Sequence, residues 1–296
     1  MENSIVKSKR VKEVDINKPK LTAKEFKRQW ILVAISAVYV IYGIIFYYLP
    51  LAGWIIAFQN FVFAKGIGGS KWVGIDKFKF LFSDKTFLMV IRNTFVMGVL
   101  NLFFSTIVAI AFAILLNEVR NKYFKKSIQT ISYMPHFLSW IIVVAIVHDA
   151  LTSTGIINDI LMRLGILKAP YAFLGDPKLF WGIVTLSHLW KETGWNAIIY
   201  LAAITSIDPC LYESASIDGA GRFQKMRHVT LPGLLPTYVV MLVMSIAGVL
   251  SNGMDQYLVF TNANNKDMIE VLDLYVYNLG IDSGAIPLST VVGMAK

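Results

Sequence analysis

The chain has 296 residues, of which 56% are hydrophobic and only 16% are charged, and its formal net charge is +9. Soluble domains carry about 25% charged residues, so this composition excludes an ordinary soluble domain. The positive charge is not explained by a nucleic-acid partner, because no DNA- or RNA-binding motif accompanies it. Several nearly uncharged runs of about 20 residues, the length that crosses a bilayer as a helix, predict one membrane-embedded helical bundle.

A basic segment precedes the first apolar run. Residues 1–30 contain nine Lys and Arg residues against four acidic residues. Such a segment keeps the N-terminus in the cytoplasm and contacts anionic lipids. It is too long, and the next apolar run too extended, for a cleaved signal peptide. We therefore predict a retained cytoplasmic tail over residues 1–29.

The apolar runs predict five full membrane spans and the start of a sixth. The last run begins near Pro287 and reaches only Lys296, ten residues in all, whereas about 20 are needed to cross the hydrocarbon core. We expect residues 30–86 to hold the first span and an external loop, and residues 87–296 to form a transmembrane domain that is incomplete at its C-terminus. The five full spans are expected at about 30–56, 87–116, 128–150, 179–207 and 237–260.

The Lys and Arg residues between the spans predict the topology. The loops on the N-terminal side of the membrane carry 16 of them, and those on the other side carry 9. Because cytoplasmic loops are enriched in Lys and Arg, the N-terminus is expected inside the cell. The first set comprises residues 1–30, 117–127 and 208–236, and the second comprises residues 51–86, 151–178 and 258–286.

Residues 208–236 form a polar island between two apolar runs. Asp208 followed by Pro209 predicts a helix start, since Asp accepts hydrogen bonds from free N–H groups and Pro suits the first helical position. Glu213 falls in the early turns, where the helix dipole favours negative charge. Gly219 predicts the end of this helix, because glycine adopts left-handed dihedral angles at little cost.

The same island predicts a protein-docking surface. Ala215 and Ser216 give the first helix a small-residue face, which another protein can approach closely. A second short helix is expected over residues 222–229, ended by Leu231 and Pro232. The alternative is a loop that only satisfies its own backbone. That alternative explains the capping residues, but neither the length of the island nor its small face.

These residues resemble the EAA motif of permeases from bacterial binding-protein-dependent ABC importers. That motif reads Glu-Ala-Ala, three residues, Gly, nine residues, Ile, one residue, Leu-Pro. Ser214 replaces the second Ala and Val229 replaces the Ile, and Asp218-Gly219-Ala220 matches the common Asp-Gly-Ala core. The segments 124–136 and 190–204 also resemble the sugar-permease branch, with the aldouronate/oligosaccharide permeases closest.

The resemblance implies an all-α integral membrane protein with the type I ABC importer transmembrane fold, a MetI-like helical bundle in the bacterial cytoplasmic membrane. It implies a non-enzymatic permease subunit that forms half of a carbohydrate pathway. The implied partners are a second homologous permease, an ABC ATPase dimer that uses ATP and Mg, and an extracellular solute-binding lipoprotein. No Walker-type phosphate loop is present, and no directly bound cofactor or metal is expected. The ATPase-coupling loop would comprise Glu213, Ala215, Asp218, Gly219, Ala220, Arg222, Val229, Leu231 and Pro232.

Polar residues in or near the apolar runs are candidates for the translocation pathway. Such groups are costly in hydrocarbon and usually face the interior of the protein. Structural alternatives remain open: Lys191 and Glu192 either form an internal ion pair or snorkel toward the membrane surface. Asp255 and Gln256 either line the pathway or lie at the outer membrane interface. Pro135 is expected to kink its helix. The candidate pathway residues are Lys191, Glu192, Trp195, Asn252, Asp255 and Gln256.

Two other functions compete with this interpretation. A membrane enzyme would need converging acid–base or metal-ligand groups, and His136, His148 and Asp149 are the only loose candidates, with no known ligand spacing. A secondary transporter or channel would predict inverted repeats with broken helices, which the sequence does not display. Cys210 is the single cysteine, which excludes an intrachain disulfide.

Overall fold

The computed structural model describes residues 29–296, so the predicted cytoplasmic tail lies outside the described residues, apart from its last position. Two compact units divide this part of the chain between Trp54 and Ile55. Helices dominate both. The only strands in the described range are β1 (Gln59–Asn60) and β2 (Lys71–Trp72), which pair antiparallel.

The first unit is a continuous helical segment. It begins with α2 (Trp30–Gly43) and continues through a π turn (Ile44–Tyr48) into a 3₁₀ segment (Leu49–Phe58) that runs into the second unit. No side chain of α2 is buried, and the mean hydropathy of the segment is 2.2. An apolar helix without a buried face suits a lipid environment, in agreement with the first predicted span.

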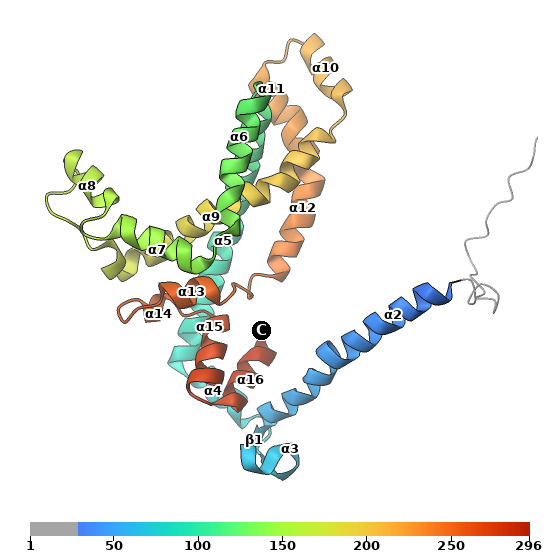
Figure 1. Cartoon of the computed structure of the whole chain (residues 1–296), viewed down its shortest axis with the longest axis vertical. Coiled ribbons are helices and arrows are strands. Elements are labelled where there is room, and N and C mark those ends of the chain that lie inside the picture. The colour runs from blue at the N-terminus through green and yellow to red at the C-terminus, as the bar shows by residue number, and fades with distance from the viewer. Residues whose placement is uncertain (1–28) are drawn as a thin grey trace, which may run out of the picture. The chain divides into compact units, whose positions relative to one another are not determined.

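The centre of the second unit is a pair of long helices, α5 (Lys85–Glu118) and α9 (Phe180–Thr205), which pack along one another (Figure 1). The helix α6 (Lys122–Tyr133) and the helix α12 (Leu231–Ala247) lie against α9. Small side chains allow these close approaches, as is usual between membrane helices. The buried cluster between them comprises Ala109, Ala113, Ile114, Ala197, Tyr200, Ile204 and Leu234.

The predicted third span, residues 128–150, is wrong as a single helix. The chain instead forms α6, a 3₁₀ turn (Met134–Phe137) and a separate helix α7 (Trp140–Leu151). Pro135 lies in the turn, where it cannot donate a backbone hydrogen bond. Ser139 then caps a new helix, because its hydroxyl accepts from the amide of Ile142 at 3.4 Å. The expected kink at proline is therefore a complete break.

The predicted fifth span, residues 237–260, is also wrong in its bounds. A continuous helical stretch runs from Arg222 to Ala247, through α11 (Arg222–Lys225), a π turn (Met226–Thr230) and α12. Leu231 and Pro232 do not end the second short helix as expected. Pro232 lies in the first turn of α12, after a π turn that already departs from regular α-helical hydrogen bonding, so the missing N–H costs little.

After α12 the chain leaves the helix and returns as a series of short elements. Gly253, with φ of 77°, makes a turn that other residues rarely adopt. The last helix has ten residues and starts where the sixth span was expected. The remaining helices are α3 (Gly66–Gly69), α4 (Asp76–Ser83), α8 (Ile156–Arg163), α10 (Pro209–Ile217), α13 (Asp255–Phe260), α14 (Lys266–Ile269), α15 (Leu272–Tyr277) and α16 (Ile286–Ala295).

A buried polar contact fixes α14 on the long helix pair. The amide of Asn93 on α5 is fully buried and donates to the backbone carbonyls of Asp267 at 3.0 Å and Glu270 at 3.2 Å. The indole of Trp181 on α9 donates to the carbonyl of Met268 at 2.7 Å. These bonds satisfy carbonyls at the end of a short helix, which would otherwise be left without partners.

The loop between α8 and α9 is held by its own side chains. Asn158 is fully buried, donates to the carbonyls of Thr152 and Tyr171, and accepts from the amide of Tyr171 at 2.8 Å. The hydroxyl of Tyr171 donates to Asp176 at 2.5 Å. That hydrogen bond lowers the pKa of the Asp176 carboxyl, and the amide of Lys178 adds to the effect. The loop is therefore an ordered element of the fold.

Four helical stretches within residues 29–296 are long and apolar enough to cross a membrane. The helix α9 has 26 residues, enough to cross, but its polar centre lowers its hydropathy and it is not one of the four. The structure therefore supports a multi-pass helical membrane protein. The four stretches are Trp30–Phe58, Lys85–Glu118, Trp140–Arg163 and Arg222–Ala247.

Candidate coupling loop and translocation cavity

The polar island contains a capped short helix, as the sequence predicts. The helix α10 begins at Pro209, and the carboxylate of Asp208 accepts from the amide of Cys210 at 2.9 Å. It ends at Gly219, whose φ of 77° lies in the left-handed region. The amide of Ala220 then bonds to the carbonyl of Ala215 at 2.9 Å, a usual closure for a helix end. The predicted start and end of this helix are confirmed.

The second half of the island is tied back to the first. The side chain of Gln224 accepts from the amide of Gly221 at 2.7 Å and so caps α11. The ammonium group of Lys225 donates to the hydroxyl of Ser216 on α10 at 2.6 Å. Both bonds are local, so residues 208–230 form a closed loop with its own hydrogen bonds. We call this segment the coupling loop.

The tip of the coupling loop exposes large apolar side chains. Leu211 is 54% exposed, Phe223 is 72% exposed and Ile217 is 87% exposed. Sequence reasoning did not select them, although apolar residues inside a polar island are a signal for contact with a partner. Of the predicted coupling residues, Ala215, Ala220 and Val229 are half-buried. Glu213, Asp218, Gly219, Arg222, Leu231 and Pro232 are exposed.

A polar cavity of about 280 Å³ lies among α5, α9, α12 and the segment that follows α12. The side-chain oxygens of Asn101 and Ser105, which line it, are buried and have no hydrogen-bond partner among the described residues. The polar residues that line the cavity are Asn101, Ser105, Thr106, His188, Asn196, Tyr200, Ser245, Ser251 and Asn252.

Among the six candidate pathway residues, Asn252 is the one that lines this cavity within the described part of the chain. Its amide donates to the carbonyl of Thr94 at 2.9 Å. Gln256 is buried and donates to the carbonyl of Val184 at 2.9 Å, whereas Asp255 is exposed. Sequence reasoning missed Asn101 and the other lining residues of α5 and α9. Their helical spacing, at Asn101 and Ser105 or at His188 and Asn196, was the available signal.

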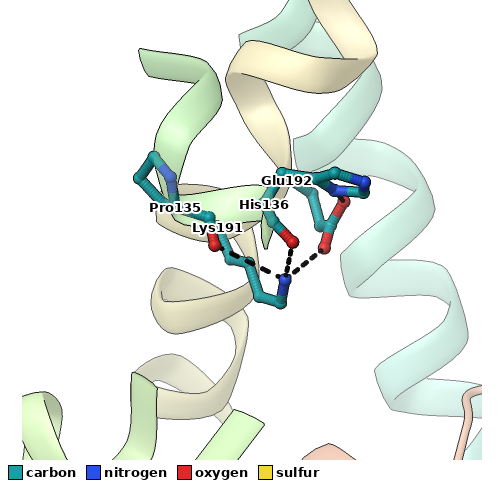
Figure 2. Close-up of polar contacts among 4 residues, drawn as sticks. All are labelled: Pro135, His136, Lys191 and Glu192. Atoms are coloured by element: carbon teal, nitrogen blue, oxygen red, sulfur yellow. Dashed lines mark hydrogen bonds and ion pairs between the residues drawn. The ribbon is translucent and has the colours of Figure 1, made fainter. Parts of the chain in front are cut away.

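Two of the remaining three candidates, Lys191 and Glu192, lie at the break between α6 and α7 (Figure 2). The ammonium group of Lys191 donates to the carbonyl of His136 at 2.5 Å and lies 3.5 Å from the carbonyl of Pro135. It also lies 3.5 Å from Glu192 Oε1. The other oxygen of Glu192 is 2.7 Å from Nδ1 of His136. Lys191 therefore satisfies the carbonyls that the helix break exposes.

Aromatic rings complete this cluster. The ammonium group of Lys191 lies 5.5 Å from the centre of the Trp140 ring, within the range of a cation–π interaction. The Trp195 ring stacks on His136 with centroids 4.4 Å apart and planes inclined by 2°. Of the two alternatives left open, an internal ion pair describes Lys191 and Glu192. Their geometry assigns them a structural role at the break.

The residues considered for an enzyme are dispersed. His136 contacts Glu192, as described above, while His148 and Asp149 lie 3.9 Å apart with both side chains largely exposed. Within residues 29–296, no three His, Cys, Asp or Glu side chains are grouped closely enough to hold a metal ion.

Comparison with known proteins decides the family. The model of the family described as "Binding-protein-dependent transport system inner membrane component" matches residues 102–295. The chain belongs to this family. The match includes the coupling loop, the cavity-lining residues of α9 and α12, those of α5 from Leu102 onward, and the Lys191 cluster, whereas Gly98 and Asn101 lie before it.

Two relatives from Bacillus subtilis (strain 168) match most of the chain. The polygalacturonan/rhamnogalacturonan transport system permease protein YteP is 41% identical over 257 residues, which is 86% of this chain and 79% of the relative. Protein LplB is also 41% identical over 257 residues, which is 86% of this chain and 80% of the relative. Both therefore share most of their length with this chain.

The fold also matches a solved transporter. A bacterial ABC transporter that imports the acidic polysaccharide alginate contains a chain that superposes with a TM-score of 0.83 and 36% identity. The match covers 92% of this chain and 91% of that chain. The same transporter has been solved with an alginate pentasaccharide-bound periplasmic protein, and its chain also gives a TM-score of 0.83.

Family membership settles the class of protein. This ABC importer permease is a transporter membrane subunit and not an enzyme, and it is a helical multi-pass membrane protein. The resemblance of residues 213–232 to the EAA motif is thereby confirmed as a family resemblance, and the sugar-permease branch agrees with the relatives. A secondary transporter or channel is not favoured.

Proposed function

We propose that this permease is one of two homologous membrane subunits of an ATP-driven importer of oligosaccharides. It lies in the bacterial cytoplasmic membrane with its N-terminus inside the cell. The coupling loop carries this proposal, because it is a compact, capped element with an exposed apolar tip in a chain that belongs to an importer family. Five full spans and a sixth complete the bundle in the proposed assembly.

The coupling loop would dock in a groove on an ABC ATPase. A short helix that presents apolar side chains suits such a groove, and Leu211, Ile217 and Phe223 supply them. The ATPase dimer binds ATP and Mg, while this chain binds no cofactor. Energy enters when the ATPase binds one conformation of the permease pair better than the other, which shifts the population between inward-facing and outward-facing states.

The polar cavity would form half of the sugar pathway, and the second permease would supply the other half. Polar side chains in its lining, among them His188, Asn196 and Asn252, can exchange hydrogen bonds with the hydroxyl groups of a sugar. Relatives named for transport of polygalacturonan, rhamnogalacturonan and lactose support a carbohydrate substrate. The solved complex with a periplasmic protein supports an extracellular solute-binding partner.

Co-purification tests the proposal directly. The chain is expressed with its neighbouring permease and ATPase, and the ATPase retained in detergent is measured. Retention that Glu213→Ala or Gly219→Asp removes would establish the coupling loop as the docking element. A folded, membrane-inserted permease that never retains an ATPase would overturn the proposal and favour a transporter without an ATPase.

Gly219→Asp is expected to abolish coupling to the ATPase without preventing membrane insertion. Asp at this exposed turn adds a negative charge beside the C-terminal end of α10, where the helix dipole disfavours it, and lacks the ease with which glycine adopts φ of 77°. Gly221→Asp is the matched control, because Gly221 has φ of −69° and begins α11, where Asp is a favoured cap. ATPase retention is measured for both. Equal retention by the two variants would contradict the role of the turn.

Asn101→Leu is expected to reduce uptake of a labelled oligosaccharide by proteoliposomes at least tenfold while the unfolding temperature stays the same or rises. The reason is that Asn101 lines the cavity, so leucine removes a polar group from the proposed pathway while it keeps a side chain of similar size in the packed interior. Thr106→Val is the control, since Thr106 already bonds to the carbonyl of Leu102 at 2.7 Å. A large fall in stability with Asn101→Leu would show that this residue is structural instead.

A further inference from the structure

The side chain of Tyr212 links α10 of the coupling loop to the N-terminal end of α12, a helix that lines the cavity. The hydroxyls of Tyr212 on α10 and Thr230 lie 3.0 Å apart, within hydrogen-bond distance. Thr230 is 6% exposed and is the last residue of the π turn that leads into α12. Tyr212 is half-buried, on a helix whose other side chains are mostly exposed. This bond therefore joins an otherwise surface-exposed helix to a buried point of the fold.

A second contact also holds α10 close to the N-terminal end of α12. The chain leaves α9 at Ile207, and the side chain of Ile207 packs directly on Gly233 of α12. A β-carbon at Gly233 would lie 2.6 Å from Cδ1 of Ile207, so the two segments touch without space for a larger side chain. The helix α10 is thus held to the base of α12 before its start, through Ile207, and within its length, through Tyr212.

The helix held in this way reaches the cavity. Met241 and Ser245 of α12 line it, and Gly248 and Val249, which follow α12, line it too. Thr230 and Ser245 are 15 residues apart, which corresponds to about 22 Å along a helix. At the N-terminal end of α12, the π turn Met226–Thr230 interrupts the α-helical hydrogen bonds between α11 and α12. Such turns often occur at functional positions in helices.

We propose that Tyr212 is the positioning residue that makes α10 and α12 move as one body, so that displacement of the coupling loop reaches the cavity. This inference rests on the proposed function, because it requires an ATPase that displaces α10. Without the bond, only the Ile207 contact and the bond from Lys225 to Ser216 restrain α10, so its angle to α12 varies more. The exposed apolar residues of the coupling loop would still dock on the ATPase, but the displacement of α10 would not be transmitted to α12.

The test measures whether α10 and α12 stay together when nucleotide is bound. The native Cys210 on α10 and a Val243→Cys substitution on the exposed face of α12 are spin-labelled in the full transporter in nanodiscs. Pulsed dipolar spectroscopy then gives their distance without nucleotide and with ATP and vanadate. The labelled transporter with Tyr212 and Thr230 intact is expected to give one narrow distance distribution in both states.

Tyr212→Phe removes only the hydroxyl. This variant is expected to retain the ATPase but to broaden the distribution of distances between the two spin labels. The fraction of molecules outside the main peak should rise about fivefold, the change in population that corresponds to the loss of one hydrogen bond. Thr230→Val should give the same result, and the double variant should be no worse than either single variant. Tyr123→Phe is the control, since Tyr123 is 86% exposed on α6.

Three results would overturn the inference. The first is a narrow, nucleotide-independent distance in the Tyr212→Phe variant. The second is additive effects of Tyr212→Phe and Thr230→Val, since residues that act through one bond do not add. The third is a distance that changes with nucleotide in the labelled transporter with Tyr212 and Thr230 intact. Failure of the unsubstituted permease to retain an ATPase is a separate result, which would overturn the proposed function and this inference with it.

Discussion

Replacing Gly194 with alanine is expected to separate α6 from α9 and to lower the unfolding temperature of the permease by several degrees. A β-carbon at Gly194 would lie 2.1 Å from the backbone oxygen and 2.5 Å from the backbone carbon of Ser132. Because these are backbone atoms, no side chain can rotate away, and the helices must move apart. Forcing extra atoms into a packed interface costs about 1–3 kcal/mol.

The effect reaches function because Ser132 lies one turn before the helix break that Lys191 caps. We therefore expect at least a tenfold loss of oligosaccharide uptake along with the loss of stability, measured by thermal unfolding in nanodiscs and by uptake into proteoliposomes. Gly182→Ala is the matched control on the same helix, since nothing lies within 4 Å of a β-carbon there. Equal effects of the two substitutions would show that helix packing at Gly194 is not the cause.

Replacing Lys191 with methionine is expected to have an even larger effect on stability. Methionine retains most of the apolar stem but removes the ammonium group that bonds to the carbonyl of His136 and pairs with Glu192. Lys191 is only 6% exposed, so Glu192 would lose its lysine partner in a largely water-free setting and keep only the contact with His136. Removing one member of a buried ion pair costs about 3–5 kcal/mol. The unfolding temperature and the yield of membrane-inserted protein measure this loss.

Two further variants isolate the cause of that loss. Lys168→Met changes an exposed lysine of the loop between α8 and α9 and is expected to leave stability unchanged. The double variant Lys191→Met/Glu192→Gln removes both charges, so it should recover part of the stability that the single variant loses. The carbonyls at the break would still lack their donor, which limits the recovery. If Lys191→Met matched Lys168→Met, the cluster would have no structural role.

Local signals in the sequence predicted the coupling loop well. Asp208 and Pro209 begin α10 and Gly219 ends it, because caps and left-handed turns depend on residues only a few positions apart. The same locality explains the errors. Pro232 was taken as a helix end from its own chemistry, whereas the π turn before it allows the helix to continue. Likewise, a hydropathy average over residues 128–150 cannot distinguish one helix from two, because the strongly apolar α7 dominates it.

The sequence by itself determined the membrane class, the family motif and the ends of α10, because composition and short-range spacing carry that information. Only the tertiary structure decided which polar residues meet. His136 and Glu192 are 56 positions apart, and Asn93 and Glu270 are 177 positions apart, so no local pattern pairs them. The cavity likewise depends on which faces of α5, α9 and α12 turn toward one another. That choice follows from the packing of small residues between long helices, which a single sequence does not specify.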